Sequence, residues 1–227
     1  MSELTPVRAR LLTCRIVEQV EPSLARALGF SPQHVSAAFI TCDQDDSLYA
    51  ALDHATKAAE VDVVYAKSFY AGSAHASGPL SGEVMGVLAG PNPAEVNEAV
   101  WALREAINGP IHFVTVEGTS GPAFFPYVVS ETGRYLSAQA GIALGEPLAY
   151  LIAPPVEAML GLDAALKAAN VKMVKFFGPP TETNYAGAYL TGRLADVEAA
   201  ALAFTDAVVS VVQGPMSGLV RPERERR

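Results

Sequence analysis

The sequence predicts an α/β (α+β) protein built from two tandem domains, each a mostly antiparallel sheet with helices on one face. Two observations predict this class. A thirteen-residue segment recurs later in the chain, and each copy is flanked by the same order of strand-like and helix-like stretches. Each half is also too short for a doubly wound parallel sheet, so helices packed on one face of a sheet are the expected arrangement.

The repeat is visible by direct comparison of the two halves. Residues 52–64 (LDHATKAAEVDVV) match residues 162–174 (LDAALKAANVKMV) at eight of thirteen positions, with a constant offset of 110 residues. A match of this length indicates a tandem duplication. We therefore expect a first domain over residues 1–113 and a second over residues 114–217. Residues 218–227 contain four arginines and are expected to form a disordered basic tail.

Strands are expected at corresponding places in the two halves. Short apolar runs flanked by polar or turn residues are typical of buried strands. The expected strands cover residues 35–41, 62–68 and 83–89 in the first half and residues 146–152, 172–177 and 187–190 in the second.

Helices are expected between and after these strands. Asp46 or Ser47 can cap a helix that runs to Ala59, and Asn92 followed by Pro93 is typical of a second helix start. The matching helix of the second half begins near Ala195. Both late helices repeat apolar residues at the i, i+4, i+7 spacing of an amphipathic face. These residues are Val96, Val100, Leu103 and Ile107 in one copy and Val197, Ala201, Phe204 and Val208 in the other.

The repeat breaks at two loops, residues 70–82 and 177–185. Both are rich in Gly, Pro, Ser and Thr, so neither predicts a packed element. Loops often carry the function of a rigid scaffold, and a matched pair in a duplicated protein is a candidate for such a role. Two ordinary surface hairpin connections are the alternative.

Composition limits the class of partner. Half of the residues are hydrophobic and only 18% are charged, which favours an oligomer because large apolar faces need cover. The net charge of −8 argues against nucleic acid as a partner. No stretch approaches the length of a membrane span and no leader pattern is present, so we expect a cytoplasmic protein that binds no membrane.

Catalytic and metal-binding motifs are not predicted. Cys14 and Cys42 are too few for a disulfide framework or a zinc site and are expected to pack on strands. The four histidines lack metal-ligand spacing, and the glycines of residues 72–82 fit neither a dinucleotide-binding nor a P-loop pattern. We expect no cofactor, no metal and no catalytic nucleophile.

An acidic cluster is the main candidate for binding. Asp45 and Asp46 follow one expected strand and Glu83 begins another, so a sheet can bring the three carboxylates together. Clustered carboxylates repel one another, and a small organic cation relieves this repulsion through charge-assisted hydrogen bonds. The alternative is that acids at a helix N-terminus complement its dipole, which accounts for Asp45 and Asp46 but not for Glu83.

Several ordered strings resemble the L-type ethanolamine-utilisation shell proteins of bacterial microcompartments. The resemblance covers the whole chain except its extreme termini. The strings are SGEV (81–84), AGPNPAEV (89–96), AGIALGEPLAY (140–150), APPVEA (153–158), TETNY (181–185) and FTDAV (204–208).

This resemblance implies two circularly permuted microcompartment domains per chain and a homotrimer that forms a pseudohexagonal tile. The tiles pack with other shell proteins into a hexagonal layer. The resemblance also implies that the two divergent loops gate a large central pore at the threefold axis. Gate residues carried over by position are Tyr70, Gly72, His75, Gly78, Gly82, Phe177, Pro179 and Pro180.

The resemblance further implies a small acidic pore within each subunit, where ethanolamine or a similar small cation binds. Asp45, Asp46 and Glu83 correspond to the residues that contact the ammonium group. The rest of the pore wall corresponds to Phe113, Tyr127, Thr183, Asn184 and Tyr185.

Three alternative functions remain open from the sequence. The first is a sensor or regulator that binds small amines without forming a shell, and the second is a shell tile of a compartment for a different substrate. The third, an enzyme that uses the carboxylates as acid and base, lacks an accompanying group to activate a substrate.

Overall fold

The computed structural model describes residues 3–69, 78–118, 121–179, 181 and 183–217. Within this part of the chain each half forms a four-stranded sheet and its helices. The first half contains β2 (Leu11–Val17), α1 (Pro22–Ala27), β3 (Ser36–Cys42), α2 (Asp45–Ala58), β4 (Asp62–Ser68), β5 (Val84–Gly90) and α3 (Pro93–Asn108). The second half contains β7 (Phe125–Val129), α4 (Arg134–Ala140), β8 (Leu148–Ala153), α5 (Pro155–Ala168), β9 (Lys172–Phe177), β10 (Ala186–Thr191) and α6 (Leu194–Gln213). Two further strands, β1 (Leu4–Val7) and β6 (Phe113–Val116), pair with each other as a separate antiparallel ribbon.

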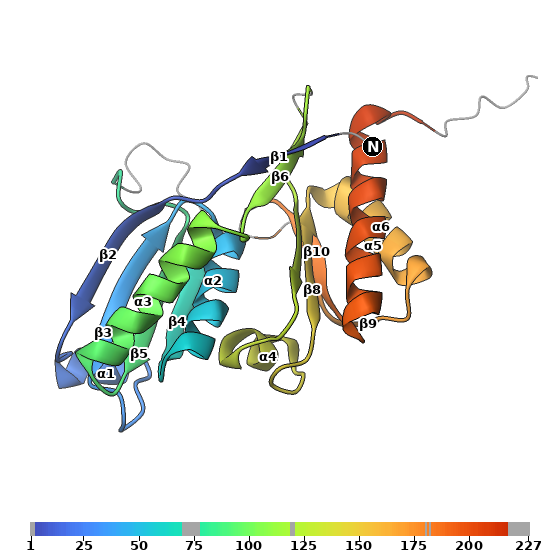
Figure 1. Ribbon diagram of the computed structural model, residues 1–227. Helices are drawn as coiled ribbons and strands as arrows, with labels where there is room; N and C mark the ends of the chain where they lie inside the picture. Colours follow the sequence, from blue (N-terminus) through green and yellow to red (C-terminus); the bar gives the residue numbers. More distant parts are fainter. Residues whose placement is uncertain (1–2, 70–77, 119–120, 180, 182, 218–227) are drawn as a thin grey trace, which may run out of the picture.

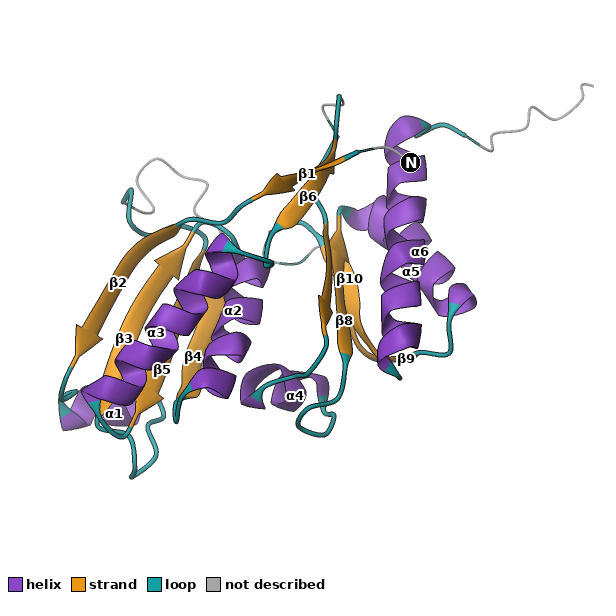
Figure 2. Cartoon of the chain, viewed as in Figure 1, coloured by secondary structure: helices purple, strands orange, loops and turns teal. Residues whose placement is uncertain are grey.

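The two sheets have the same topology. Their strand orders are β2-β3-β5-β4 and β7-β8-β10-β9, and all neighbouring strands are antiparallel. Figures 1 and 2 show that sheets and helices alternate as layers: the first sheet, α2 with α3, the second sheet, and α5 with α6. The prediction of tandem antiparallel sheets with helices on one face is confirmed.

The spacing of the elements locates the break in the repeat. The helices α2 and α5 begin 110 residues apart, as do the strands β4 and β9. The strands β5 and β10 begin only 102 residues apart. The second half is therefore eight residues shorter between its last two strands, and each of the two divergent loops joins a pair of antiparallel neighbours.

Most predicted element boundaries agree with the structure within two residues. Asn92 caps α3 as expected, since its Oδ1 accepts a hydrogen bond from the Glu95 N–H at 3.0 Å. The predicted cap of α2 was wrong, because Gln44 is the N-cap and Asp45 and Asp46 lie inside the first turn. Two acidic side chains in that turn are stabilised by the helix dipole without capping it.

Several elements were not predicted. For β2 only a strand position at Cys14 was expected, without bounds, and the edge strand β7, the ribbon strands β1 and β6, and the short helices α1 and α4 were missed. In β2 each residue is exposed or only half-buried, so its sequence lacks the clear apolar alternation of a core strand. Cys14 of β2 and Cys42 of β3 lie on strands with free thiols, as expected.

The strand β8 of the second sheet is buried on both faces. In β8, Ala149, Leu151 and Ala153 pack with α5 and α6, whereas Tyr150 and Ile152 pack into the cluster that contains α2. Every residue of β8 is consequently buried. The helices of the first half therefore pack against both sheets, and one hydrophobic cluster contains residues of both halves.

A polar clamp also joins the two halves. The buried Asp53 carboxylate of α2 accepts hydrogen bonds from the Gly133 and Leu136 N–H groups, each at 2.7 Å, at the start of α4. The Arg134 guanidinium donates to Asp62 at 3.2 Å and to the Ala59 carbonyl at 3.1 Å. These bonds fix the position of α4 against α2 and β4. Among the described helices, none is both long and apolar enough to cross a membrane.

Candidate functional site

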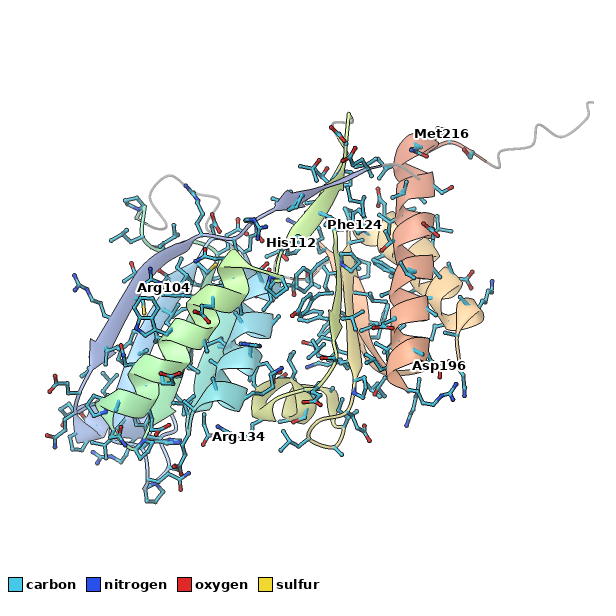
Figure 3. All side chains as sticks on the ribbon, viewed as in Figure 1. Arg104, His112, Phe124, Arg134, Asp196 and Met216 are labelled. Carbon is cyan, nitrogen blue, oxygen red and sulfur yellow. The ribbon has the colours of Figure 1, made fainter. Side chains whose placement is uncertain are left out.

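Two adjoining cavities lie where side chains of both halves meet, one between α2 and the second sheet and the other at the N-terminal end of α2. Figure 3 shows the side chains of both halves in this region. The acidic cavity has a volume of about 300 Å³ and is lined by Val7, Asp43, Gln44, Asp45, Glu83, Phe113, Ala123, Thr183 and Tyr185. The tyrosine cavity has a volume of about 240 Å³ and is lined by Asp45, Asp46, Tyr49, Ala66, Lys67, Ser68, Tyr135, Gln139, Tyr150, Ile152, Lys175, Phe177, Thr181, Thr183, Tyr185 and Tyr189. Asp45, Thr183 and Tyr185 line both cavities and form the boundary between them.

The first turn of α2 brings two buried carboxylates to this boundary. Asp45 and Asp46 are only 9% and 7% exposed. Oδ1 of Asp45 accepts a hydrogen bond from the Asp46 N–H at 2.8 Å, and the Tyr150 hydroxyl donates to Oδ1 of Asp46. Tyr150 lies on the second sheet, so this bond joins the acidic turn of one half to the strand of the other.

The buried position changes the acidity of these groups. Burial, and then the negative charge of Asp45, raises the pKa of Asp46 well above its ordinary value, while the hydrogen bond from Tyr150 opposes this rise. Burial likewise raises the pKa of Tyr150, and the charge of Asp46 adds to the effect. The pKa of Tyr49, one turn further along α2, rises to about 12 because it is buried. A cation placed here would relieve an existing excess of negative charge.

Glu83 reaches the acidic cavity from the turn before β5. Its N–H donates to the Cys42 carbonyl at 2.9 Å, which ties it to the end of β3. The preceding Gly82 has φ +63°, and a Cβ at this position would lie 2.0 Å from the Cys42 carbonyl oxygen. Only glycine fits this turn, so it fixes where Glu83 begins the strand.

Hydrogen bonds between Thr181 and residues 184 and 185 hold Tyr185 where it lines both cavities. The Tyr185 N–H donates to Oγ1 of Thr181 at 3.1 Å, and the Asn184 N–H donates to the Thr181 carbonyl at 3.1 Å. Asn184 is exposed with φ +64°, a conformation that asparagine tolerates better than most residues, and it lines neither cavity. Burial raises the pKa of Tyr185, and the charges of Asp46, Asp45 and Glu83 add to this rise. All three carboxylates therefore act on the same phenol.

The other two aromatic residues expected in the pore wall, besides Tyr185, have different positions. Phe113 lines the acidic cavity and makes an edge contact with Tyr185, with ring centroids 6.0 Å apart. Tyr127 lines neither cavity. Its ring packs on Phe125 at 5.5 Å, as part of the aromatic core behind the site.

The expected gate residues are only partly covered by the structure. Tyr70, Gly72, His75 and Pro180 lie outside the described residues. Gly78 is in a turn, where its N–H donates to Oγ of Ser81 at 3.2 Å. Pro179 is exposed. Phe177 is the last residue of β9 and lines the tyrosine cavity, with its ring 4.9 Å from that of Tyr189.

Sequence reasoning missed most of the tyrosine cavity. Tyr49, Tyr135, Tyr150 and Tyr189 come from two helices and two strands of the two halves, and their convergence depends on how the halves pack. The one available signal was polar aromatic side chains in otherwise apolar stretches, as in Tyr150 of LAYLIA. A buried tyrosine needs a hydrogen-bond partner, and here that partner is Asp46.

The arrangement suits the binding of a small cation. It offers carboxylates, phenols and threonine hydroxyls around enclosed space, and carboxylates form strong hydrogen bonds with an ammonium group. Among the described residues, no group of three His, Cys, Asp or Glu side chains is placed to hold a metal ion.

Comparison with known proteins identifies the family. A family model described as the BMC domain matches residues 36–118. The bacterial microcompartment shell protein EutL of Clostridium perfringens is 52% identical over 210 residues, which span 92% of this chain and 97% of that protein. The EutL protein of Salmonella typhimurium is 46% identical and spans 95% of this chain and 99% of its own length.

A solved structure agrees with this assignment. The crystal structure of ethanolamine utilization protein EutL from Leptotrichia buccalis superposes with a TM-score of 0.90 and 47% identity, covering 93% of this chain and 98% of that chain. Both the sequence and the fold thus match over nearly the full length. The chain therefore belongs to the EutL family of bacterial microcompartment shell proteins, which are structural proteins and not enzymes.

Proposed function

We propose that this shell protein works as a homotrimer, a pseudohexagonal tile with a gated central pore and a small acidic pore in each subunit that binds ethanolamine. Membership of the shell family supports assembly into a layer with other shell proteins. The trimer, the ligand and the gate are supported by features at the contact between the two halves of the chain.

The trimer is supported by a difference in exposure between the helix α5 and its counterpart in the first half, α2. Four apolar side chains of α5 are exposed by 37 to 62%. The residues at the same positions of α2, 110 earlier, are buried or half-buried against the second half. The exposed residues are Val156, Met159, Leu160 and Leu166, and their counterparts are Asp46, Tyr49, Ala50 and Thr56. The α5 surface therefore lacks the sheet that covers α2, and the first sheet of a second copy can supply it.

The short helices support the same contact. In the second half α4 packs on α2, and its third residue, Leu136, is fully buried. In the first half α1 occupies the matching place between β2 and β3, yet its third residue, Leu24, is 47% exposed. In a ring of copies α1 would pack on α5 of the neighbouring subunit. Such head-to-tail contacts between identical chains form a closed ring when the rotation closes, and three chains of two domains give a pseudohexagon.

The native mass tests the assembly. Light scattering coupled to gel filtration should give three times the chain mass of 23.8 kDa. A monomer at high protein concentration would contradict the tile and favour a sensor that does not form a shell.

Ethanolamine binding is supported by the chemistry of the acidic cavity. Three carboxylates, those of Asp43, Asp45 and Glu83, line it together with Thr183. Asp45 and Glu83, with Asp46 behind them, are the candidate ammonium ligands, and Asp43 pairs with Arg10 at 2.9 Å. The Leptotrichia buccalis relative is described as an ethanolamine utilization protein, and this chain is similar to it over nearly its full length.

Calorimetric titration with ethanolamine tests the ligand. Glu83→Gln should weaken binding about tenfold or more, because a charge-assisted hydrogen bond contributes roughly 1.5 to 3 kcal/mol. Glu117→Gln is the matched control, since this exposed carboxylate lies outside both cavities. Equal affinity of the Glu83→Gln variant and the wild type would remove Glu83 from the site.

The gate proposal rests on two residues of the shorter divergent loop. Thr183 and Tyr185 line both cavities and belong to the shorter of the two divergent loops. A ligand that contacts them can shift the loop only if the open and closed states bind it with different affinity. We also assign the two domains to residues 1–113 and 114–217, with residues 218–227 as a basic tail.

A further inference from the structure

A lysine of the second half extends along the aromatic wall of the tyrosine cavity. Lys175, a half-buried residue of β9, donates a hydrogen bond from Nζ to Oε1 of Gln139 on α4 at 2.9 Å. The same Nζ lies 5.3 Å from the ring centroid of Phe177 and 5.9 Å from that of Tyr189. Both distances are within the range of a cation–π contact.

The surroundings of this ammonium match those of a bound organic cation. Phe177 and Tyr189 supply ring faces, and Asp45 and Asp46 lie on the wall of the same cavity. Aromatic rings combined with carboxylates are the usual recognition elements for quaternary ammonium groups. Partial burial lowers the pKa of Lys175, the direction expected for a charged amine that has lost part of its hydration. The ring faces are thus already in use by a cation of the protein itself.

The two cavities also differ in the charges on their walls. Among the described residues, the lining of the acidic cavity contains three carboxylates and no lysine or arginine, whereas that of the tyrosine cavity contains Lys67 and Lys175 as well as Asp45 and Asp46. A free cation is therefore attracted to the carboxylates of the acidic cavity and repelled by the two lysines of the tyrosine cavity. The strand itself does not require a lysine, since the matching residue of the first half, 110 positions earlier, is Tyr65.

We propose that Lys175 is a specificity-determining residue: its tethered ammonium occupies the ring faces of Phe177 and Tyr189 and so restricts the site to one small primary ammonium ion beside Asp45. This inference rests on the proposed binding of a small amine. Without Lys175, the tyrosine cavity is an aromatic cage with buried carboxylates, suited to the larger trimethylammonium group of choline.

The experiment compares choline and ethanolamine as calorimetric ligands of the full-length protein. Lys175→Met keeps most of the apolar stem but removes the charge. We expect its affinity for choline to rise about three- to thirtyfold over the wild type, the range of one partly buried cation–π contact. Its affinity for ethanolamine should rise by about two- to fivefold, because a like charge near the site is lost. Lys172→Met on the same strand is the matched control, since Lys172 is exposed and lines neither cavity.

Two further variants separate charge from folding. Lys175→Arg keeps a cation at the rings and should continue to exclude choline. Lys175→Gln removes the charge with a polar side chain and should gain choline binding as Lys175→Met does, which covers the case in which the methionine variant does not fold. Choline affinity within twofold of the wild type in the folded Met or Gln variant would overturn the inference. Failure of the wild type to bind ethanolamine would instead overturn the proposed ligand, and the choline result would still decide the role of Lys175.

Discussion

The surroundings of the Asp46 carboxylate are determined by both halves of the chain. Its backbone belongs to α2, but its carboxylate is held by Tyr150 of β8 and lies beside Asp45. The sequence suggested an acidic cluster at this place, and the helix dipole was a sufficient reason for two of its members. The helix dipole does not account for the burial of Asp46. A surface acid that only complements the dipole has no need of a hydrogen bond from the Tyr150 hydroxyl of the second sheet.

The pH dependence of stability follows from this environment. The pKa of Asp46 is raised in the folded protein above its ordinary value of 3.8, so the folded state binds more protons than the unfolded state between these two values. Its contribution to stability is fully present below pH 3.8, is lost as the pH rises through the raised pKa, and stays lost above it. Asp46→Asn should remove this loss while keeping an acceptor for Tyr150.

Denaturant unfolding followed between about pH 4 and pH 8 measures this difference. The free energy of unfolding of the wild type should fall relative to that of Asp46→Asn as the pH rises. If the free energies of unfolding of the two proteins change in parallel with pH, ionisation of Asp46 does not destabilise the folded state. Saturating ethanolamine should reduce the difference, since an ammonium ion compensates the buried charge.

At the scale of elements, α4 is a short helix that depends on another element for its start. Its N-cap, Gly133, has no side chain to offer, and the Asp53 carboxylate of α2 accepts the N–H groups instead. The packing of Gly133 is also close, because a Cβ there would lie 2.5 Å from the Asp53 carbonyl oxygen. The first half therefore caps a helix of the second half, and α4 marks the contact between them.

Removal of this cap should destabilise the protein. Asp53→Ala leaves two buried N–H groups without their acceptor, which should cost about 2 to 4 kcal/mol. The midpoint of urea unfolding should fall accordingly, and Asp53→Asn should lose less because its amide oxygen can still accept. Asp206→Ala, at an exposed position of α6, is the control and should change the midpoint little. A midpoint for Asp53→Ala equal to that of the control would show that α4 does not depend on this contact.

At the scale of the whole molecule, the two halves have the same topology but different neighbours. The α2 and α3 layer lies between two sheets, whereas the outer side of α5 and α6 is open in the single chain (Figure 1). Apolar side chains remain on that open side. The contact between the two halves is thus expected to recur between subunits. The open side of α5 and α6 is then covered only in a ring of copies.

A charge on the open side of α5 should break the ring. Met159→Lys places an ammonium where the counterpart Tyr49 packs on the second half, and should shift the native mass from trimer to monomer because a buried unpaired charge is costly. Leu202→Lys is the matched control. Leu202 is 68% exposed, and its counterpart Trp101 is 53% exposed, so neither copy is covered within the chain. A trimer that survives Met159→Lys but not Leu202→Lys would place the subunit contact on α6.

The sequence by itself determined the duplication, the antiparallel class, the positions of the core strands and the helix start at Asn92. These features depend on local signals, namely repeated residues, apolar periodicity and capping, which can be read without knowing which elements touch. The sequence also singled out Asp45, Asp46 and Glu83, because acids at strand ends are conspicuous. The bounds of the edge strand β2 were not predicted, since none of its residues is buried and it has no repeat match of the kind that located β9.

Only the tertiary structure decided how the halves meet. Stacking α2 against the second sheet brings Tyr150 to Asp46, and the packing of the two halves brings Asp53 to the start of α4. It also places Tyr127 behind the site and Asn184 outside both cavities. Residues that are about 80 to 100 positions apart come into contact here. No pattern in either segment specifies its partner, because such contacts are set by the packing of two complete domains.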